Sequence, residues 1–279
     1  MNRFVGIDVG AEAIKVVELA GTPGALRWTR RAAVEHRGQP EVSRAELLDG
    51  FDWAGVTGAA VTGRLGARLA LPRIPQKQAQ AAGARHLLGD QPLTIVSIGA
   101  HGCTVLELRA GGVELFRENA RCAQGTGHFL RQLVQRFGLS VEEAATLAAG
   151  VTDPAPLSGR CPVILKTDMT HLANRGEGRE RILAGLLDAI AESAQVLVKP
   201  RRGPARLVLA GGVPRAERVR AHFDRFARRH GLVLDELGAD DGLHLDALGA
   251  ALAAADHPAA PPPLAALYRP DPEIGRAHV

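Results

Sequence analysis

The chain has 279 residues, of which 46% are hydrophobic and 4% aromatic, and its formal net charge is +4. This composition is typical of a globular protein with a substantial core, and its basic runs are interrupted by acids and lack an aromatic stripe, which argues against nucleic-acid binding. Because no stretch approaches 18 uninterrupted apolar residues and the N-terminus resembles a strand rather than a signal peptide, we expect a cytoplasmic protein without membrane contact.

The first third of the chain predicts a small sheet with helices. Strands at 3–10 and 13–21 each end in glycine and should form a hairpin, because β-branched runs bounded by glycine turns pair in this way. The remaining predicted elements of this part are a strand at 25–36, a short helix at 45–55, a strand at 58–64 and a helix at 75–89.

The opening pattern of strand, turn, strand, turn and strand returns at residues 93–119, which indicates an internal duplication. Further helices are expected at 127–138, 140–150, 168–176, 180–198 and 243–257, and residues 204–231 should form a strand, a Gly-Gly turn and a helix. Ser140 and Glu143 have the spacing of a capping box.

The duplication predicts two similar halves. We expect the first half over residues 1–91 and the second over residues 92–256, with the last helix, 243–256, either staying there or returning to the first half. Residues 257–279 form a Pro-rich tail that need not be packed.

Four glycine-rich turns follow strands or precede helices, and their order suggests a nucleotide held between the two halves. "GIDVGAEAIK" offers Asp8 to a metal or water, the Gly10 backbone to a phosphate and Lys15 as a counter-charge. "IGAHG", "QGTG" and "LAGGV" offer further backbone N–H groups or a close approach to an adenosine. Neither a P-loop nor a dinucleotide-binding glycine motif is present.

Three cysteines are too few for a disulfide framework, and metal or redox chemistry is the more natural use for them. Cys122 and Cys161 each stand just ahead of a helical pattern, where the helix dipole stabilises a thiolate. The alternative is that both are small buried hydrophobes. A zinc site would lack ligands, because no CxxC or paired histidine lies nearby.

The segments "NARCAQGTGHFL", "CPVILKTDM", "LVLAGGVPRA" and "ALGAALAA" resemble the activator component of 2-hydroxyacyl-CoA dehydratases, in the BadF/BadG/BcrA/BcrD ATPase family. The resemblance covers about residues 3–255. It implies an α/β, actin-like (ribonuclease H-like) fold of duplicated domains with a nucleotide cleft, shared with sugar kinases and heat-shock ATPases.

The resemblance further implies a 4Fe–4S cluster shared across a homodimer, with Cys122 and Cys161 as the metal ligands of each chain. Cys103 stands where the family has no ligand and is expected in the core. ATP or ADP with Mg²⁺ is implied as the second cofactor, with Asp8 and His101 in catalytic positions. The implied cofactor-binding residues are Gly10, Lys15, Gly125, Thr126, Gly127, Gly211, Gly212 and Val213.

The resemblance therefore implies an ATP-dependent electron donor that reduces a partner 2-hydroxyacyl-CoA dehydratase or related iron–sulfur reductase, with ferredoxin or flavodoxin as its own donor. The chain departs from the family at both phosphate turns. "DVGAEAIK" lacks the usual hydroxyls, and His101 and Gly102 replace a Gln-Asp pair that positions water and magnesium. Asp246 stands where glycine is usual and should crowd a close helix approach.

These departures predict weak or lost hydrolysis and keep two other functions open. One is a non-hydrolysing actin-like scaffold or regulatory protein that binds nucleotide. The other is a small-molecule kinase of the same fold, which would require an aspartate base that the sequence does not make evident.

Overall fold

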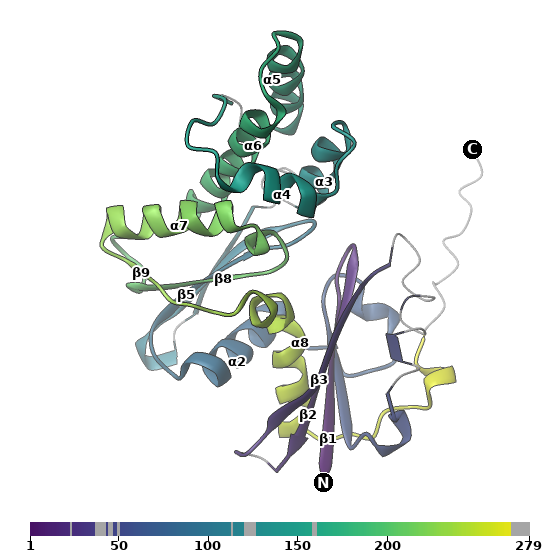
Figure 1. Ribbon diagram of the computed structural model, residues 1–279. Helices are drawn as coiled ribbons and strands as arrows, with labels where there is room; N and C mark the ends of the chain where they lie inside the picture. Colours follow the sequence, from purple (N-terminus) through teal and green to yellow (C-terminus); the bar gives the residue numbers. More distant parts are fainter. Residues whose placement is uncertain are drawn as a thin grey trace, which may run out of the picture. The chain divides into compact units, whose positions relative to one another are not determined.

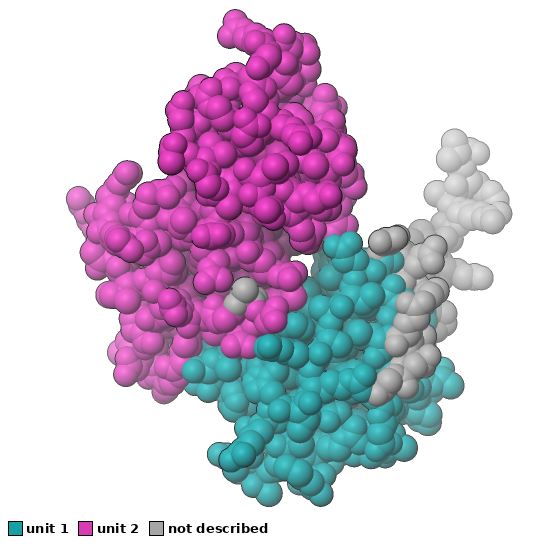
Figure 2. Space-filling view, viewed as in Figure 1, with its two compact units in different colours: residues 1–87, 244–279 teal, residues 88–243 magenta. Residues whose placement is uncertain are grey.

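The chain folds into two compact units, formed by residues 1–87 with 244–279 and by residues 88–243 (Figure 2). The computed structural model (Figure 1) describes residues 1–22, 24–36, 43, 47–48, 51–112, 114–119, 127–157 and 161–268. Within this part of the chain, no helix is both long enough and apolar enough to cross a bilayer.

Unit 1 is built on a four-stranded sheet in the order β3-β2-β1-β4. Its strands are β1 (Asn2–Val9), β2 (Ala13–Gly21), β3 (Arg27–Glu35) and β4 (Gly58–Thr62). Strands β1 and β2 form the predicted antiparallel hairpin, and β4 runs parallel to β1. Of the helix predicted at 45–55, residues 45–46 and 49–50 lie outside the described residues, and Trp53–Gly55 form a short 3-10 helix.

Helix α8 (Ala239–Asp256) packs against one face of this sheet, beside α2 (Gln76–Leu88) (Figure 1). The approach is very close, because a Cβ on Gly6 of β1 would overlap the Ala247 carbonyl of α8. A Cβ on Gly249 would likewise overlap the Ala79 carbonyl of α2. These two glycines allow α8 to lie directly on the strand that carries Asp8.

The Pro-rich tail is packed where the structure describes it, contrary to the expectation that it need not be. Leu267 is fully buried in the unit 1 core on the sheet face opposite α8. The Trp53 indole donates a hydrogen bond of 2.8 Å to the Pro262 carbonyl, and Ala70 N–H donates to the Leu267 carbonyl at 2.8 Å. Apolar burial and these hydrogen bonds hold the tail as far as residue 268.

Unit 2 has a five-stranded sheet in the order β7-β6-β5-β8-β9. Its strands are β5 (Leu93–Ile98), β6 (Cys103–Leu108), β7 (Glu114–Glu118), β8 (Arg206–Ala210) and β9 (Val233–Leu234). The last strand has two residues and was not expected from the sequence. The first four strands repeat the order and directions of the unit 1 sheet, which confirms the predicted duplication.

The helices of unit 2 are α3 (Gly127–Gln135), α4 (Val141–Ala149), α5 (Pro162–Asn174), α6 (Arg179–Gln195) and α7 (Glu217–His230). The predicted capping box is present at the start of α4, where Ser140 and Glu143 exchange hydrogen bonds. Helix α5 begins at Pro162 rather than at residue 168, because proline is well suited to the first helical position.

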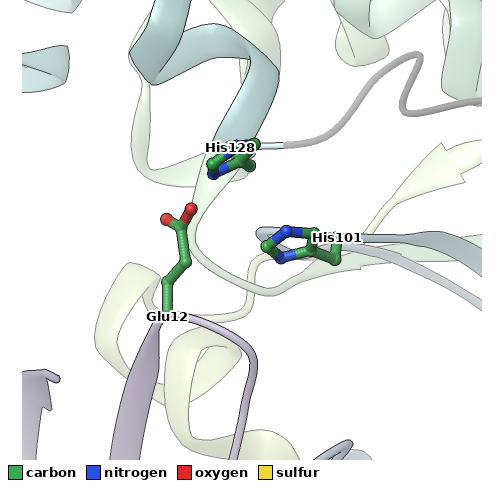
Figure 3. A group of neighbouring side chains, drawn as sticks. All are labelled: Glu12, His101 and His128. Atoms are coloured by element: carbon green, nitrogen blue, oxygen red, sulfur yellow. The ribbon is translucent and has the colours of Figure 1, made fainter. Parts of the chain in front are cut away.

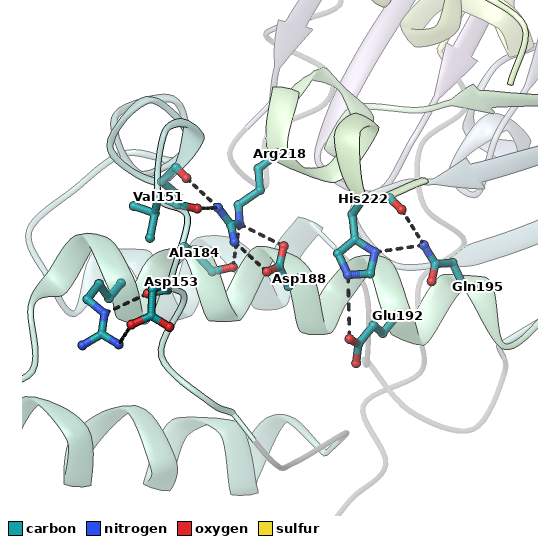
Figure 4. Close-up of polar contacts among 10 residues, drawn as sticks. Val151, Asp153, Ala184, Asp188, Glu192, Gln195, Arg218 and His222 are labelled. Carbon is teal, nitrogen blue, oxygen red and sulfur yellow. Dashed lines mark hydrogen bonds and ion pairs between the residues drawn. The ribbon is translucent and has the colours of Figure 1, made fainter. Parts of the chain in front are cut away.

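One arginine ties three of these helices together (Figure 4). The Arg218 guanidinium on α7 forms two hydrogen bonds with the Asp188 carboxylate on α6, at 2.9 and 2.7 Å. It also donates to the carbonyls of Ala148, Val151 and Ala184. Because the last carbonyls of a helix lack partners within it, Arg218 satisfies the end of α4 while it anchors α6. This buried ion pair fixes the helical layer from which α5 extends.

Candidate functional site

The predicted first phosphate turn, between β1 and β2, places a buried ion pair at the end of the unit 1 sheet. Asp8 is 6% exposed, and its Oδ2 lies 2.8 Å from Lys15 Nζ. Burial alone would lower the pKa of Lys15, but the charge and hydrogen bond of Asp8 outweigh it and raise that pKa. Lys15 is therefore positively charged at neutral pH.

Two glycines leave room for this pair. Gly10 closes the turn with a 3.0 Å hydrogen bond to the Ala13 carbonyl, and a Cβ there would lie 3.1 Å from Lys15 Nζ. Gly63, after β4, has φ +91° and would overlap Asp8 Oδ1 if it carried a Cβ. Gly63 was not predicted from the sequence, although it directly follows a strand, as Gly10 does.

Asp246 on α8 belongs to the same cluster, rather than only crowding the helix approach. Its Oδ2 accepts a 2.8 Å hydrogen bond from the Gln76 amide of α2. Burial, followed by the charge of Asp8, raises the pKa of Asp246 to about 7, although part of the side chain remains accessible. Asp246 is thus an aspartate of near-neutral pKa beside Asp8 and Lys15, which the sequence analysis did not anticipate.

The predicted second phosphate turn, between β5 and β6 in unit 2, has no carboxylate. Gly99 N–H donates to the Gly102 carbonyl at 2.9 Å, which closes the turn. The N–H groups of Gly127 and His128, which begin α3, donate to the carbonyls of Gly99 and Ala100. The N–H of Gly127 is therefore already engaged, and what Gly127 offers a ligand is its lack of a side chain.

His101 in this turn stacks on His128, with the ring centroids 4.7 Å apart (Figure 3). The structure thus brings the predicted His101 together with a histidine that the sequence analysis did not single out. Of the neighbouring candidates, Cys122, Gly125 and Thr126 lie outside the described residues.

The predicted adenosine loop follows β8. Gly211 has φ +91°, and a Cβ there would overlap the Ile98 carbonyl, so only glycine fits. Its N–H donates to the Gly242 carbonyl at 2.9 Å. Next come Gly212 and the buried Val213. A pocket of about 320 Å³ lies against the loop, lined by Gly211, Pro214 and Arg215 and by residues of α7 and the β9 region.

The two described cysteines have opposite environments. Cys103 lies in the unit 2 core, as predicted, and burial raises the pKa of its thiol to about 12. Cys161 is only partly buried and is the N-cap residue of α5, whose first turn has no side-chain cap. The thiol therefore lies where the first backbone N–H groups of α5 lack partners within the helix. Two large apolar side chains follow it in the open, Val163 at 71% and Ile164 at 50% exposure.

Known proteins resemble this chain over most of its length. The sequence profile of the BadF/BadG/BcrA/BcrD ATPase family matches residues 42–254. The (R)-2-hydroxyglutaryl-CoA dehydratase activating ATPase of Acidaminococcus fermentans is 26% identical over 254 residues, covering 89% of this chain and 95% of the relative. The activator of lactoyl-CoA dehydratase of Anaerotignum propionicum is 29% identical over 218 residues, which cover 75% of this chain and 82% of the relative.

Among solved structures, component A of (R)-2-hydroxyglutaryl-CoA dehydratase from Acidaminococcus fermentans superposes with a TM-score of 0.80 at 24% identity. The superposition covers 92% of this chain and 98% of that one. More distant sugar-kinase and pilus-assembly structures share the same actin-like fold, with TM-scores of 0.52 and 0.51. The predicted fold class is therefore confirmed.

Proposed function

Because the chain belongs to the BadF/BadG/BcrA/BcrD ATPase family, we propose that it is an ATP-dependent activator that delivers electrons to a partner iron–sulfur dehydratase or reductase. The observation that carries the proposal is the position of Cys161, a partly buried thiol at the uncapped N-terminus of α5. A thiol in that place suits a metal ligand, whereas a structural cysteine belongs where Cys103 lies.

Cys161 fits half of a cluster site on chemical grounds. A 4Fe–4S cluster needs four thiolates and, when bound, supplies one-electron transfer. With Cys122 as the second ligand, each chain provides two thiolates, so a two-fold axis has to supply the other pair. The exposed Val163 and Ile164 place apolar surface next to Cys161, which suits a homodimer contact around the shared cluster.

Nucleotide binding is supported by the glycine-rich turns, which can offer a ligand their backbone groups and the charged side chain of Lys15. Lys15 supplies positive charge for phosphate oxygens, held in place by Asp8. Gly211 and Gly212 keep the adenosine loop free of side chains. Because the turn at Gly99–Gly102 offers no carboxylate, we expect the protein to bind ATP but to hydrolyse it slowly until the partner is bound. A ferredoxin or flavodoxin is the proposed electron source.

The test is to reconstitute the protein anaerobically with iron and sulfide and to measure both per chain, together with the visible iron–sulfur absorption. Cys161→Ala should abolish cluster binding, and Cys103→Ala, which removes a thiol of the core, should retain it. Thermal melting of both variants confirms that they are folded. A cluster retained in Cys161→Ala, or lost in a folded Cys103→Ala, would contradict the proposal.

A further inference from the structure

His36, which directly follows β3, holds the turn between β1 and β2 by two hydrogen bonds. The residue is 3% exposed. Its backbone N–H donates to the Glu12 carbonyl at 3.0 Å, and its ring nitrogen Nε2 lies 3.2 Å from the Gly10 carbonyl oxygen. Because a carbonyl oxygen can only accept a hydrogen bond, Nε2 is the donor of the second bond. A residue outside the turn thus holds two of the carbonyl groups of the turn.

Two neighbouring carbonyl groups also bond within unit 1. The Val9 carbonyl accepts from the Leu65 N–H at 2.9 Å, and the Ala13 carbonyl accepts from the Gly10 N–H at 3.0 Å. These bonds, like that of the Glu12 carbonyl, come from backbone donors. The bond to the Gly10 carbonyl comes from a side chain, so a substitution of His36 can remove it without a change in the backbone.

The direction of the Gly10 carbonyl decides where the next N–H group points. The peptide is trans, and in a trans peptide the C=O and N–H bonds lie in one plane and point in opposite directions. The Ala11 N–H therefore points away from His36. Among the residues that the structure describes, this N–H donates to no backbone acceptor, and Ala11 is only partly buried. His36 thereby fixes the direction of a donor that a ligand can reach.

The side chains of the turn offer an anion little. Ala11 and Ala13 have no polar side-chain atoms, and Glu12 has a charge of the same sign as a phosphate. Lys15 is positively charged but shares its charge with Asp8 at 2.8 Å. Binding of a phosphate at this turn therefore depends on the direction of the backbone N–H groups more than it would in a turn that supplies hydroxyl groups.

We infer that His36 is a positioning residue for a phosphate group of the nucleotide, acting through the Gly10 carbonyl to direct the Ala11 N–H at the ligand. Lys15 Nζ borders the same turn, because a Cβ on Gly10 would lie 3.1 Å from it. Backbone N–H groups beside a cation are a common way to hold phosphate. The inference rests on the proposed nucleotide binding and deepens it, because it assigns part of the phosphate affinity to a residue 26 positions from the turn.

The experiment compares His36→Leu with His36→Gln. Leucine removes the donor, whereas glutamine keeps an N–H group near the position of Nε2. Displacement of a fluorescent ATP analogue by ATP and by adenosine measures the affinity for each. His36→Leu should weaken ATP binding about tenfold, the scale of one well-placed hydrogen bond, and leave adenosine binding unchanged. His36→Gln should recover most of the ATP affinity, which a loss of general packing would not allow.

His257→Leu, at an exposed histidine just after α8 in the same unit, is the matched control and should bind ATP normally. Thermal melting verifies the fold, and His36→Phe, a ring without a donor, replaces His36→Leu if the latter does not fold. Unchanged ATP binding by the folded donor-free variant, or an equal loss for ATP and adenosine, would overturn the inference and leave the proposed nucleotide binding standing. Failure of the wild type to bind ATP would overturn both.

Discussion

The two hairpin turns that the duplication produces, at Asp8–Lys15 in unit 1 and at Gly99–Gly102 in unit 2, have the same topology and opposite chemistry. The first carries a buried ion pair enclosed by glycines that leave no spare volume. The second has no carboxylate, and a Cβ on Gly102 would meet nothing within 4 Å. Duplication thus fixes where each turn lies, while the residues in the turn decide which chemical groups it offers.

The comparison predicts that equal substitutions will have very unequal effects on stability. Gly63→Ala beside the first turn should cost about 3 kcal/mol or more, because it combines an unfavourable positive φ with an overlap on Asp8. Gly102→Ala in the second turn should change the free energy of unfolding by less than about 0.5 kcal/mol. Urea denaturation of both variants measures the difference, and similar losses would show that the two turns are equally packed.

Breaking the ion pair of the first turn should cost nearly as much. Asp8→Asn leaves Lys15 charged and largely buried, and loss of one partner of a buried pair costs about 3 kcal/mol. The same variant should lower the pKa of Lys15, because burial then acts without a compensating charge. Chemical denaturation together with NMR titration of the lysine tests this prediction. The double variant Asp8→Asn with Lys15→Met should recover part of the lost stability.

Restoring charge to the second turn should raise ATP turnover. Gly102→Asp has open space for its side chain, and with His101→Gln it introduces the Gln-Asp pair that the family resemblance implies for positioning metal and water. We expect at least about a tenfold increase in single-turnover hydrolysis, equivalent to about 1.4 kcal/mol of barrier. Gly102→Ala is the control, since it fills the same space without charge. If the single-turnover rate of the double variant is unchanged, the residues of this turn do not limit ATP hydrolysis.

Asp246 should also make stability depend on pH. Its pKa is raised to about 7 from an ordinary value of 3.8, so between these values the folded state binds more protons than the unfolded state. Stability should therefore fall as pH rises from about 4 to 7. Asp246→Asn should flatten this part of the profile. A profile of unchanged slope would contradict the raised pKa.

The sequence predicted the local features well and the convergent ones poorly. The hairpins, the capping box at Ser140 and the core position of Cys103 follow from short patterns or from the family resemblance, and the structure confirms them. Asp246 was not predicted as a neighbour of Asp8, because it lies far from Asp8 in the chain and only the packing of α8 on Gly6 brings it to the strand end.

Two further elements, the tail and β9, are held by tertiary packing although their local sequence does not predict them. The tail residues at 262–267 contain prolines and no periodic pattern, yet Leu267 is buried in the same core cluster as Leu69 and Leu71. Strand β9 has two residues, too few for any pattern to be visible, and pairs with β8 because the turn after α7 returns the chain to the sheet edge. Contacts of this kind depend on tertiary packing, which local propensity does not encode.

Arg218 also has a consequence for the order in which parts of unit 2 open. It ties α4, α6 and α7 through one guanidinium, so their amide protons should exchange with solvent together, as a single cooperative unit. Helix α5 packs on α6 but has no share in that tie. The segment that begins at Cys161 should then exchange faster than the helices beneath it, which would allow the thiol to change its surroundings while the rest of the unit stays closed.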